Sequence, residues 1–281
     1  MDTSLDINQE YSNFPEYDLK ERYKLAFNWI PEGINTLLDA GCAWGYGTRF
    51  FRQKSDRVYG LDPTKSLVEV ATNRYPDIVF VENELEKTPF ETEFFDAIVS
   101  CDTLEHVRDE IACLNEMFRI LKPGGVLVIT TPHKGLFGFM DPGNSIQYME
   151  YFVKKNLSYV YRLAYRIRKG ESPETVEYVK PIYEHDTTHR HYSLYDFLNM
   201  LNKSSFKDNY ELVQTFRSGL FIGVFTLNLE FYLSLFIKGK VRELIVKPFL
   251  VLSEIDFWIP YNILGYNIGV KIIKKTVNNQ A

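Results

Sequence analysis

The sequence predicts an α/β fold with a buried parallel sheet, and three features of the chain support this. Short apolar runs alternate with segments of helical periodicity between residues 36 and 131. A turn of small residues, 41–47, follows the first apolar run. Two extended segments, 210–216 and 266–275, come near the end of the chain. Strands that alternate with helices are typical of βαβ units, in which helices cover both faces of the sheet.

The predicted elements follow one another in a regular order. The apolar runs are residues 37–38, 58–61, 78–81, 97–99 and 126–130, and helical segments between them are 66–74 and 109–121. Ser193, with Asp196 three residues later, predicts the start of a helix over 194–201. In the last segment every second residue is apolar, which places these residues on one face of a strand. They are Tyr266, Ile268, Val270 and Ile272.

Composition excludes several classes of protein. The 281 residues carry a formal net charge of −5, and 45% of them are hydrophobic. The hydrophobic content allows a sizeable core, and the acidic balance argues against a dedicated nucleic-acid binder, which is usually basic. The three cysteines form no CxxC pair, which predicts neither a disulfide framework nor a thiolate metal site. The polar first thirty residues predict no signal peptide and a cytoplasmic location.

Three parts of one domain are expected along the chain. Residues 1–132 form the half that contains the small-residue turn. Residues 133–192 form an insertion or lid, in which the acid-free stretch 151–169 predicts a basic amphipathic helix. Residues 193–281 complete the sheet and contain an apolar helical insertion at 219–262.

The small-residue turn is the strongest functional signal in the sequence. An apolar strand runs into Asp39 and then into Gly41, Cys42, Ala43 and Gly45. Small residues allow the backbone to approach a ligand closely and to open a helix. The glycine spacing does not match the G-x-G-x-x-G pattern that binds a pyrophosphate, so a ligand without phosphates fits better.

Acidic residues follow the next strands at the same predicted edge of the sheet. Asp62 ends the second strand about twenty residues beyond the turn, where a carboxylate suits the two hydroxyls of a ribose. Glu84 follows the third strand and can accept a hydrogen bond from an exocyclic amine. Open α/β sheets bind their ligands at this edge.

These residues resemble the cofactor half of the class I S-adenosylmethionine-dependent methyltransferases. The family pattern hhD-x-G-x-G-x-G is matched by residues 37–45, with Ala43 in place of the second glycine. Alanine permits the same close approach when its φ is negative. The segments FDAIVSCDTLEHV and LKPGGVLVITTP are similar to the family's fourth-strand and fifth-strand motifs. The resemblance covers residues 37–132.

The resemblance implies a Rossmann-like, seven-stranded sheet, mostly parallel with an antiparallel edge strand, with helices on both faces and helical insertions. It implies S-adenosyl-L-methionine as the cofactor. It also implies a set of residues that bind this cofactor. These are Asp39, Gly41, Cys42, Ala43, Gly45, Asp62, Glu84, Leu85 and Cys101.

Methyl transfer to an oxygen or nitrogen requires a base that removes the acceptor's proton. His133, which follows the fifth strand, and His106 are the predicted catalytic residues. His106 belongs to the set Asp102-x-x-Glu105-His106, which resembles a motif associated with a divalent metal in quinone-biosynthesis O-methyltransferases. The alternative is a helix start with acids in its first turn. We assign no metal ligand here, and a metal requirement stays open.

Further histidines lie in the segment EHDTTHRHYS. Together with Asp186, the residues His185, His189 and His191 could hold a metal, but their spacing matches no recognised zinc pattern. A role in covering the substrate is therefore favoured for this segment.

The two insertions predict peripheral contact with the inner face of a membrane. Residues 219–262 contain two apolar stretches of about twenty residues, the length that spans a bilayer. Charged side chains inside these stretches argue against spanning, and they include Glu230, Lys247, Glu254 and Asp256. We expect both 151–169 and 219–262 to contact the membrane surface. The alternative is a lid helix with a solvated basic face at 151–169 and helices packed over the sheet edge at 219–262.

The predicted function is methyl transfer from S-adenosylmethionine to a small or lipid-linked acceptor. The expected reaction is O-methylation of a surface glycan, a quinone or a lipid intermediate. The alternative is a non-catalytic, membrane-associated scaffold that binds S-adenosylmethionine.

Overall fold

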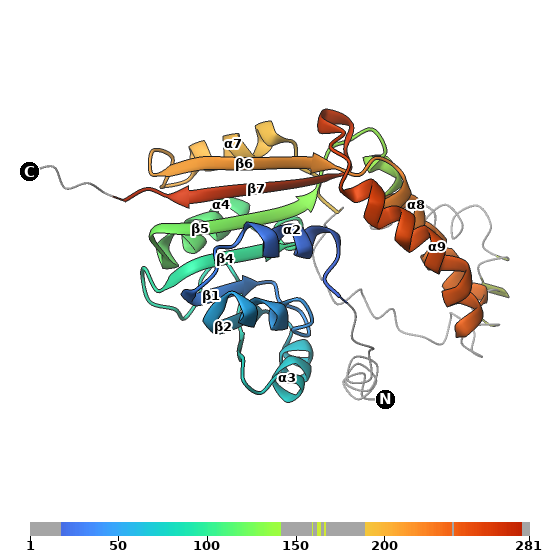
Figure 1. Ribbon diagram of the computed structural model, residues 1–281, viewed down its shortest axis with the longest axis horizontal. Helices are drawn as coiled ribbons and strands as arrows, with labels where there is room; N and C mark the ends of the chain where they lie inside the picture. Colours follow the sequence, from blue (N-terminus) through green and yellow to red (C-terminus); the bar gives the residue numbers. More distant parts are fainter. Residues whose placement is uncertain are drawn as a thin grey trace, which may run out of the picture.

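A seven-stranded sheet forms the centre of the protein, with strand order β3-β2-β1-β4-β5-β7-β6 (Figure 1). The computed structural model describes residues 18–141, 159, 162–163, 166, 189–237 and 239–276. The strands are β1 (Ile34–Ala40), β2 (Ser55–Asp62), β3 (Val79–Glu82), β4 (Phe95–Cys101), β5 (Leu121–Pro132), β6 (Tyr210–Ser218) and β7 (Asn267–Lys274). The predicted α/β fold is therefore confirmed.

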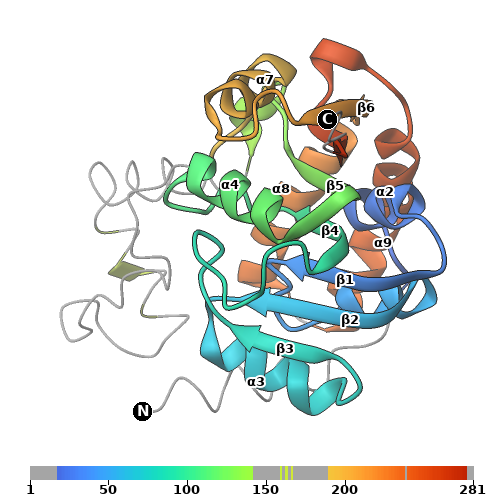
Figure 2. The same cartoon turned by 90° about the vertical axis from the view of Figure 1, so that its left-hand side faces the viewer.

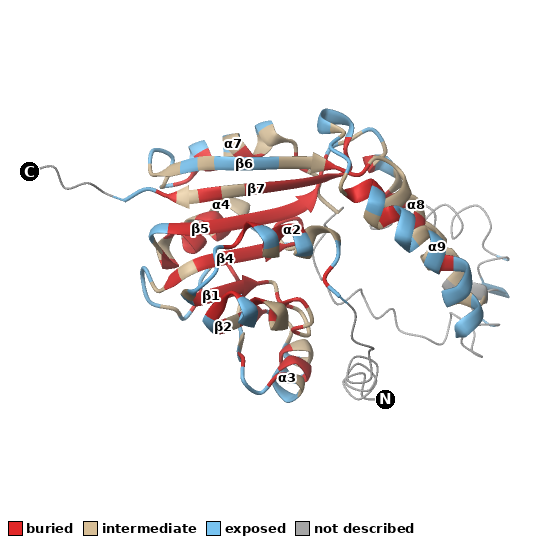
Figure 3. Ribbon diagram, viewed as in Figure 1, coloured by how far each residue is buried: buried red, intermediate tan, exposed pale blue. Residues whose placement is uncertain are grey.

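The first five strands are parallel, and β7 runs antiparallel to both of its neighbours, β5 and β6. The antiparallel strand thus lies one position inside the edge, and β6 forms the edge itself. The burial of their side chains explains why β7 is the inner strand and β6 the edge strand. Most residues of β7 are buried, whereas most residues of β6 are exposed or half-buried (Figure 3). A strand that is apolar on both faces is stable only between two neighbours.

Helices cover both faces of the sheet (Figure 2). The described helices are α2 (Glu21–Trp29), α3 (Lys65–Arg74), α4 (Glu110–Ile120), α7 (Leu194–Lys203), α8 (Ile222–Phe236) and α9 (Lys240–Phe257). Successive strand residues supply opposite faces, because side chains alternate along a strand. Leu38 packs in one core cluster with α4 and α7, whereas its neighbour Leu37 packs in a second cluster with α2.

Two helix starts are fixed by the local sequence. The side chain of Asp109 accepts hydrogen bonds from the N–H groups of Ile111 and Ala112, both at 2.9 Å, and this begins α4. Ser193 and Asp196 form a reciprocal capping box at the start of α7, as the sequence predicts. These caps satisfy backbone donors that a helix leaves unpaired in its first turn.

Helices α8 and α9 form a hairpin within residues 219–262, where the sequence predicts an apolar helical insertion. The hairpin extends beyond the end of the sheet at which β6 finishes (Figure 1). The carboxylate of Asp256 in α9 holds the hairpin closed. It accepts hydrogen bonds from three successive backbone N–H groups at the start of α8, at 2.9–3.3 Å. No helix among the described residues has both the length and the apolar character that crossing a bilayer requires.

One prediction for the insertions stays untested, and one prediction for the segment after the small-residue turn needs correction. Most of the predicted basic helix 151–169 lies outside the described residues, as do His185 and Asp186. The helix expected directly after the small-residue turn is a short 3-10 helix, η1 (Thr48–Gln53).

Candidate functional site

The carboxyl ends of the parallel strands place the predicted site residues side by side. Strand β1 lies between β2 and β4, with Ala40 opposite Leu61 and Asp39 opposite Val99. The residues that follow these strands therefore meet at one edge of the sheet. At this edge the small-residue turn follows β1, and Asp62 is the last residue of β2.

Backbone hydrogen bonds hold the start of the turn against β2. The N–H groups of Gly41 and Cys42 both donate to the carbonyl oxygen of Leu61, at 2.7 and 3.0 Å. Gly41 has φ +86°, and a Cβ at this position would collide with the side chain of Thr103. Thr103 in turn donates to the carbonyl oxygen of Ala40 at 3.0 Å. The turn is therefore in contact with the segment that follows β4, and only glycine fits at position 41.

The carboxylate of Asp62 fixes the next part of the turn. One oxygen accepts a hydrogen bond from the N–H of Ala43 at 3.0 Å, and the other accepts from the N–H of Thr64 at 2.9 Å. The condition set for close approach at Ala43, a negative φ, is not met, because its φ is +46°. Left-handed backbone is disfavoured for alanine, and the hydrogen bond from its N–H to Asp62 helps to hold it there.

Asp39 is a fully buried carboxyl group below the turn. Burial raises its pKa to about 7, and the negative charge of Asp62 acts in the same direction. The hydroxyl of Thr48 donates to one oxygen at 2.7 Å, and both this hydrogen bond and the side chain of Tyr23 lower the pKa. The other oxygen, Oδ1, has no hydrogen-bond partner among the described residues. A buried acceptor without a partner is costly, so it indicates a ligand with a donor or a positive charge.

The residues of this edge fit S-adenosylmethionine. Asp62 retains free lone pairs that can accept from the two ribose hydroxyls, because a carboxylate accepts about four hydrogen bonds. The unsatisfied oxygen of Asp39 suits a positively charged ligand. Gly45 has φ +77°, and a Cβ at this position would lie 2.7 Å from the ring of Phe80, so a glycine is needed here.

The other predicted cofactor residues lie in different environments. Cys42, Leu85 and Cys101 are buried in the protein, and burial raises the pKa of both thiols. Glu84 is half exposed and forms an ion pair with Arg108 at 3.0 Å. The structure leaves the carboxylate of Glu84 accessible, while Leu85 and Cys101 belong to the two core clusters, and cofactor binding by these residues stays a prediction.

The two predicted catalytic histidines have different environments. His133 is buried, and its Nδ1 donates to the carbonyl oxygen of Gly265 at 2.7 Å. Burial lowers the pKa of His133, which favours the neutral imidazole. His106 is exposed on the turn after β4, and its ring lies 4.8 Å from that of His189.

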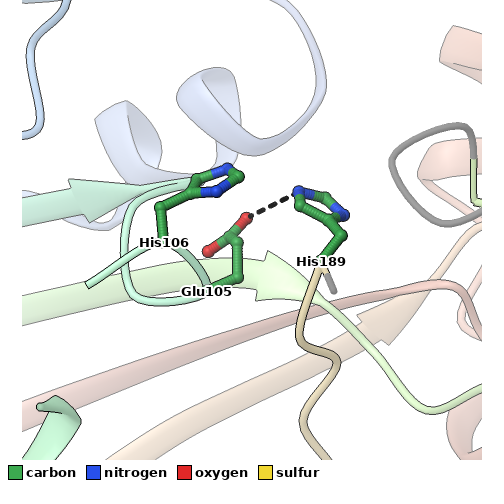
Figure 4. A group of neighbouring side chains, drawn as sticks. All are labelled: Glu105, His106 and His189. Carbon is green, nitrogen blue, oxygen red and sulfur yellow. Dashed lines mark ion pairs between the residues drawn. The ribbon is translucent and has the colours of Figure 1, made fainter. Parts of the chain in front are cut away.

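Asp102 does not join Glu105 and His106 in one group of metal ligands. Its carboxylate forms an ion pair with Arg22 of α2, and its backbone has φ +52°. One group of described residues that could hold a metal contains Glu105, His106 and His189 instead (Figure 4). Residues 104–106 form a turn rather than a helix, so the alternative interpretation, a helix start with acids in its first turn, is not found there.

The segment 189–192 reaches this edge because Arg190 ties it to the loop before α4. The guanidinium of Arg190 donates to the carbonyl oxygens of Glu105 and Val107 and to the carboxylate of Glu110. The hydroxyl of Tyr192 also donates to the carbonyl of Leu104, at 3.1 Å. This attachment places His189 over Glu105.

Two polar residues of this region were missed by the sequence reasoning. Asp141 accepts hydrogen bonds from His189 and His191, and Tyr266 donates to the same carboxylate. No motif surrounds either residue, so only proximity in space identifies them. His189 and His191 carried a weak signal, an H-x-H pair.

The comparisons with known proteins agree on one family. Residues 38–129 match the family model described as "Methyltransferase domain". A malonyl-[acyl-carrier protein] O-methyltransferase of Serratia marcescens is 33% identical over 95 residues, 34% of this chain and 37% of the relative. A ubiquinone biosynthesis O-methyltransferase of Haemophilus ducreyi is 30% identical over 130 residues, 41% of this chain and 55% of the relative. The matched segments thus span about half of these relatives or less.

A solved structure shows the same fold over most of the chain. A geranyl diphosphate methyltransferase in complex with S-adenosylmethionine aligns with a TM-score of 0.53 and 12% identity. The alignment covers 90% of this chain and 84% of that one. At this identity the likeness establishes the fold alone.

The raised pKa of Asp39 predicts a pH-dependent gain in stability for the Asp39→Asn variant. In the unfolded chain this carboxyl ionises near pH 4, but in the fold only at about 7, so its ionisation destabilises the fold as the pH rises between these values. Asparagine removes this penalty. We expect a gain of about 1–4 kcal/mol near pH 8 and a much smaller gain near pH 5, from urea unfolding. The exposed Asp208→Asn variant is the control, and equal gains at both pH values would contradict the prediction.

The positive φ of Ala43 predicts that Ala43→Gly is stabilising. Glycine adopts this conformation without strain, although it loses more entropy on folding, so we expect a net gain of about 0.5–1 kcal/mol. Urea unfolding measures it. Ala112→Gly within α4 is the matched control, and there the same exchange is expected to destabilise by about 1 kcal/mol. A destabilised Ala43→Gly variant would show that the turn does not hold alanine under strain.

Proposed function

Residues 38–129 form a class I S-adenosylmethionine-dependent methyltransferase domain, and on this premise we propose that the chain transfers a methyl group to an oxygen of a small or lipid-linked acceptor. The cluster at the carboxyl edge of β1 and β2 carries this proposal. There Asp62 shapes the turn through Ala43, and Asp39 leaves a buried oxygen unsatisfied. These features suit a cationic nucleoside ligand.

The residues of the edge would divide the recognition of the cofactor between them. Asp62 would accept hydrogen bonds from the ribose hydroxyls, and Glu84 would accept from the adenine amine. Asp39 lies below the turn, where its charge would favour the positive end of the ligand. S-adenosylmethionine supplies an electrophilic methyl group on a sulfonium, so the protein chiefly needs to hold donor and acceptor in line.

The acceptor would lie next to the segment after β4. Thr103 contacts the cofactor turn, and Glu105, His106 and His189 follow on the same side. An oxygen acceptor must lose its proton as it takes the methyl group, and for that role His133 and His106 stay predictions. Oxygen is favoured as the acceptor atom because relatives from two organisms are named as O-methyltransferases.

We also propose that the α8–α9 hairpin lies on a membrane surface. Large apolar side chains are exposed along it and on the loop that follows, with 74% of Leu244, 57% of Ile255 and 69% of Ile263 accessible. Figure 3 shows these exposed stretches away from the sheet. Lys240, Arg242 and Lys247 on α9 would favour anionic lipids. A lipid-linked acceptor would then reach the site from that surface.

A non-catalytic scaffold that binds S-adenosylmethionine is the alternative function. The strained Ala43 in place of a glycine is the observation that favours it. This alternative predicts binding of the cofactor without methyl transfer to any component of a lipid extract.

The cofactor assignment predicts that Asp62→Ala loses affinity for S-adenosylmethionine. Removing a carboxylate that accepts hydrogen bonds from the ribose and holds Ala43 is expected to weaken binding by about 10- to 100-fold. Isothermal calorimetry measures this, with circular dichroism as the check of folding. Asp77→Ala removes an exposed carboxylate and is the control. Equal affinities of the Asp62 variant and the wild type would contradict the assignment, and no binding by the wild type would overturn the proposed function.

The membrane assignment predicts that the full chain sediments with vesicles that contain phosphatidylglycerol, and less with pure phosphatidylcholine. The Leu244→Asp/Ile255→Asp variant is expected to bind the anionic vesicles about tenfold more weakly or worse, because it places charges on the contacting face. Val213→Asp adds a charge at an exposed apolar position of β6 and is the control. Unchanged binding of the double variant would contradict the proposed surface.

A further inference from the structure

Two segments that are distant in the sequence from Asp141 converge on its carboxylate. His189 Nδ1 lies 2.8 Å from Oδ2 of Asp141, and His191 Nε2 lies 3.0 Å from the same oxygen. The hydroxyl of Tyr266 lies 2.5 Å from it. The side chain of Asp141 is only 2% exposed. We propose that Asp141, His189 and His191 bind one divalent transition-metal ion of the zinc type.

The separations of the ligand atoms fit a common ion. Zinc forms bonds of about 2.0–2.2 Å to nitrogen and oxygen, and tetrahedral geometry then places ligand atoms roughly 3.3 Å apart. The separations from Asp141 to His189 and His191 are 2.8 and 3.0 Å, a few tenths of an ångström below this value, and the ligand atoms of the three residues all lie within 4.8 Å of one another. Without an ion, two imidazoles and one hydroxyl must all donate to one oxygen.

The donor set selects the kind of metal. Two imidazole nitrogens and one carboxylate oxygen are ligands that zinc and its neighbours in the first transition row prefer. Magnesium and calcium prefer sites built entirely of oxygen ligands. The three protein ligands leave one position of a tetrahedron for water or for the hydroxyl of Tyr266.

The other nitrogen of His189 also has a partner in place. Nε2 faces Oε1 of Glu105 at 3.9 Å, and this oxygen is buried without a hydrogen-bond partner among the described residues. When Nδ1 of His189 binds a metal, Nε2 carries the proton and can donate to Glu105 after a small approach. Metal-bound histidines usually donate their second N–H to a carboxylate or carbonyl in this way.

A second group of possible ligands shares His189 but fits less well. It consists of Glu105, His106 and His189, and Figure 4 shows the two rings on either side of the Glu105 carboxylate. The 3.9 Å between Glu105 and His189 exceeds the separation of roughly 3.3 Å that a tetrahedral zinc ion requires. His106 is also exposed, whereas Asp141 is buried. We therefore assign the ion to the group of Asp141, His189 and His191.

The position of the cluster in the chain indicates a structural role for the ion. Asp141 and His189 are 48 positions apart in the sequence. One ion bound by both would tie these points together at the edge of the sheet. Tyr266 joins the cluster to the start of β7. This inference does not depend on the proposed methyl transfer.

The test is a zinc titration of the untagged, full-length chain after treatment with EDTA. Calorimetry with a competing chelator measures the affinity, and the visible absorption of bound Co²⁺ reports a tetrahedral site. We expect one ion per chain and a thermal midpoint that rises by several degrees with saturating zinc. Asp141→Asn and His191→Ala are expected to bind zinc about 30- to 100-fold more weakly or worse. No binding by the wild type at micromolar zinc would overturn the proposal.

Two more variants decide between the sides of His189 and protect the test against misfolding. His106→Ala is the matched control, and its zinc affinity is expected to stay within about threefold of the wild-type affinity. If His106→Ala lost as much zinc affinity as His191→Ala, the ion would lie beside Glu105 and the assignment would be overturned. His191→Cys replaces His191→Ala in the test if the alanine variant fails to fold, and it is expected to bind zinc because cysteine is also a zinc ligand. Loss of zinc binding by a folded His191→Cys variant would also overturn the proposal. Parallel titrations with S-adenosylmethionine keep this result separate from the proposed function.

Discussion

The carboxylate of Asp62 is the contact on which the organisation of the site depends. It receives the N–H of Ala43 from the turn after β1 and the N–H of Thr64 from the start of the next segment. The contact exists because β1 and β2 are parallel neighbours that end at the same edge. It couples the shape of the turn to the register of the two strands, so a shift of either strand would remove the site.

The same edge is also where the elements added to the sheet are anchored. Arg190 ties the segment before α7 to the loop before α4, and Arg22 of α2 pairs with Asp102. Asp256 closes the α8–α9 hairpin beside the end of β6. Each anchor is a charged side chain that satisfies groups of a neighbouring segment. Such contacts specify one arrangement of loops that apolar packing alone would leave less defined.

The site is built at a cost in stability. Asp39 is fully buried with one oxygen unsatisfied, and burial raises its pKa to about 7. Glu105 is buried with one unsatisfied oxygen as well. In a core that served only stability, apolar residues would be favoured at such positions. These two buried oxygens without partners among the described residues thus lie where ligands are proposed to bind.

The sequence by itself determined the α/β fold, the seven strands, the capped start of α7 and the place of the cofactor turn. These depend on local patterns, such as the alternation of apolar runs and the spacing from Gly41 to Asp62. Only the tertiary structure decided the sign of φ at Ala43, the inner position of β7 and the cluster around Asp141. Asp141 lies 48 residues from His189 and 125 from Tyr266 in the sequence. The packing of distant segments against one edge brings them together, and no local pattern encodes such packing.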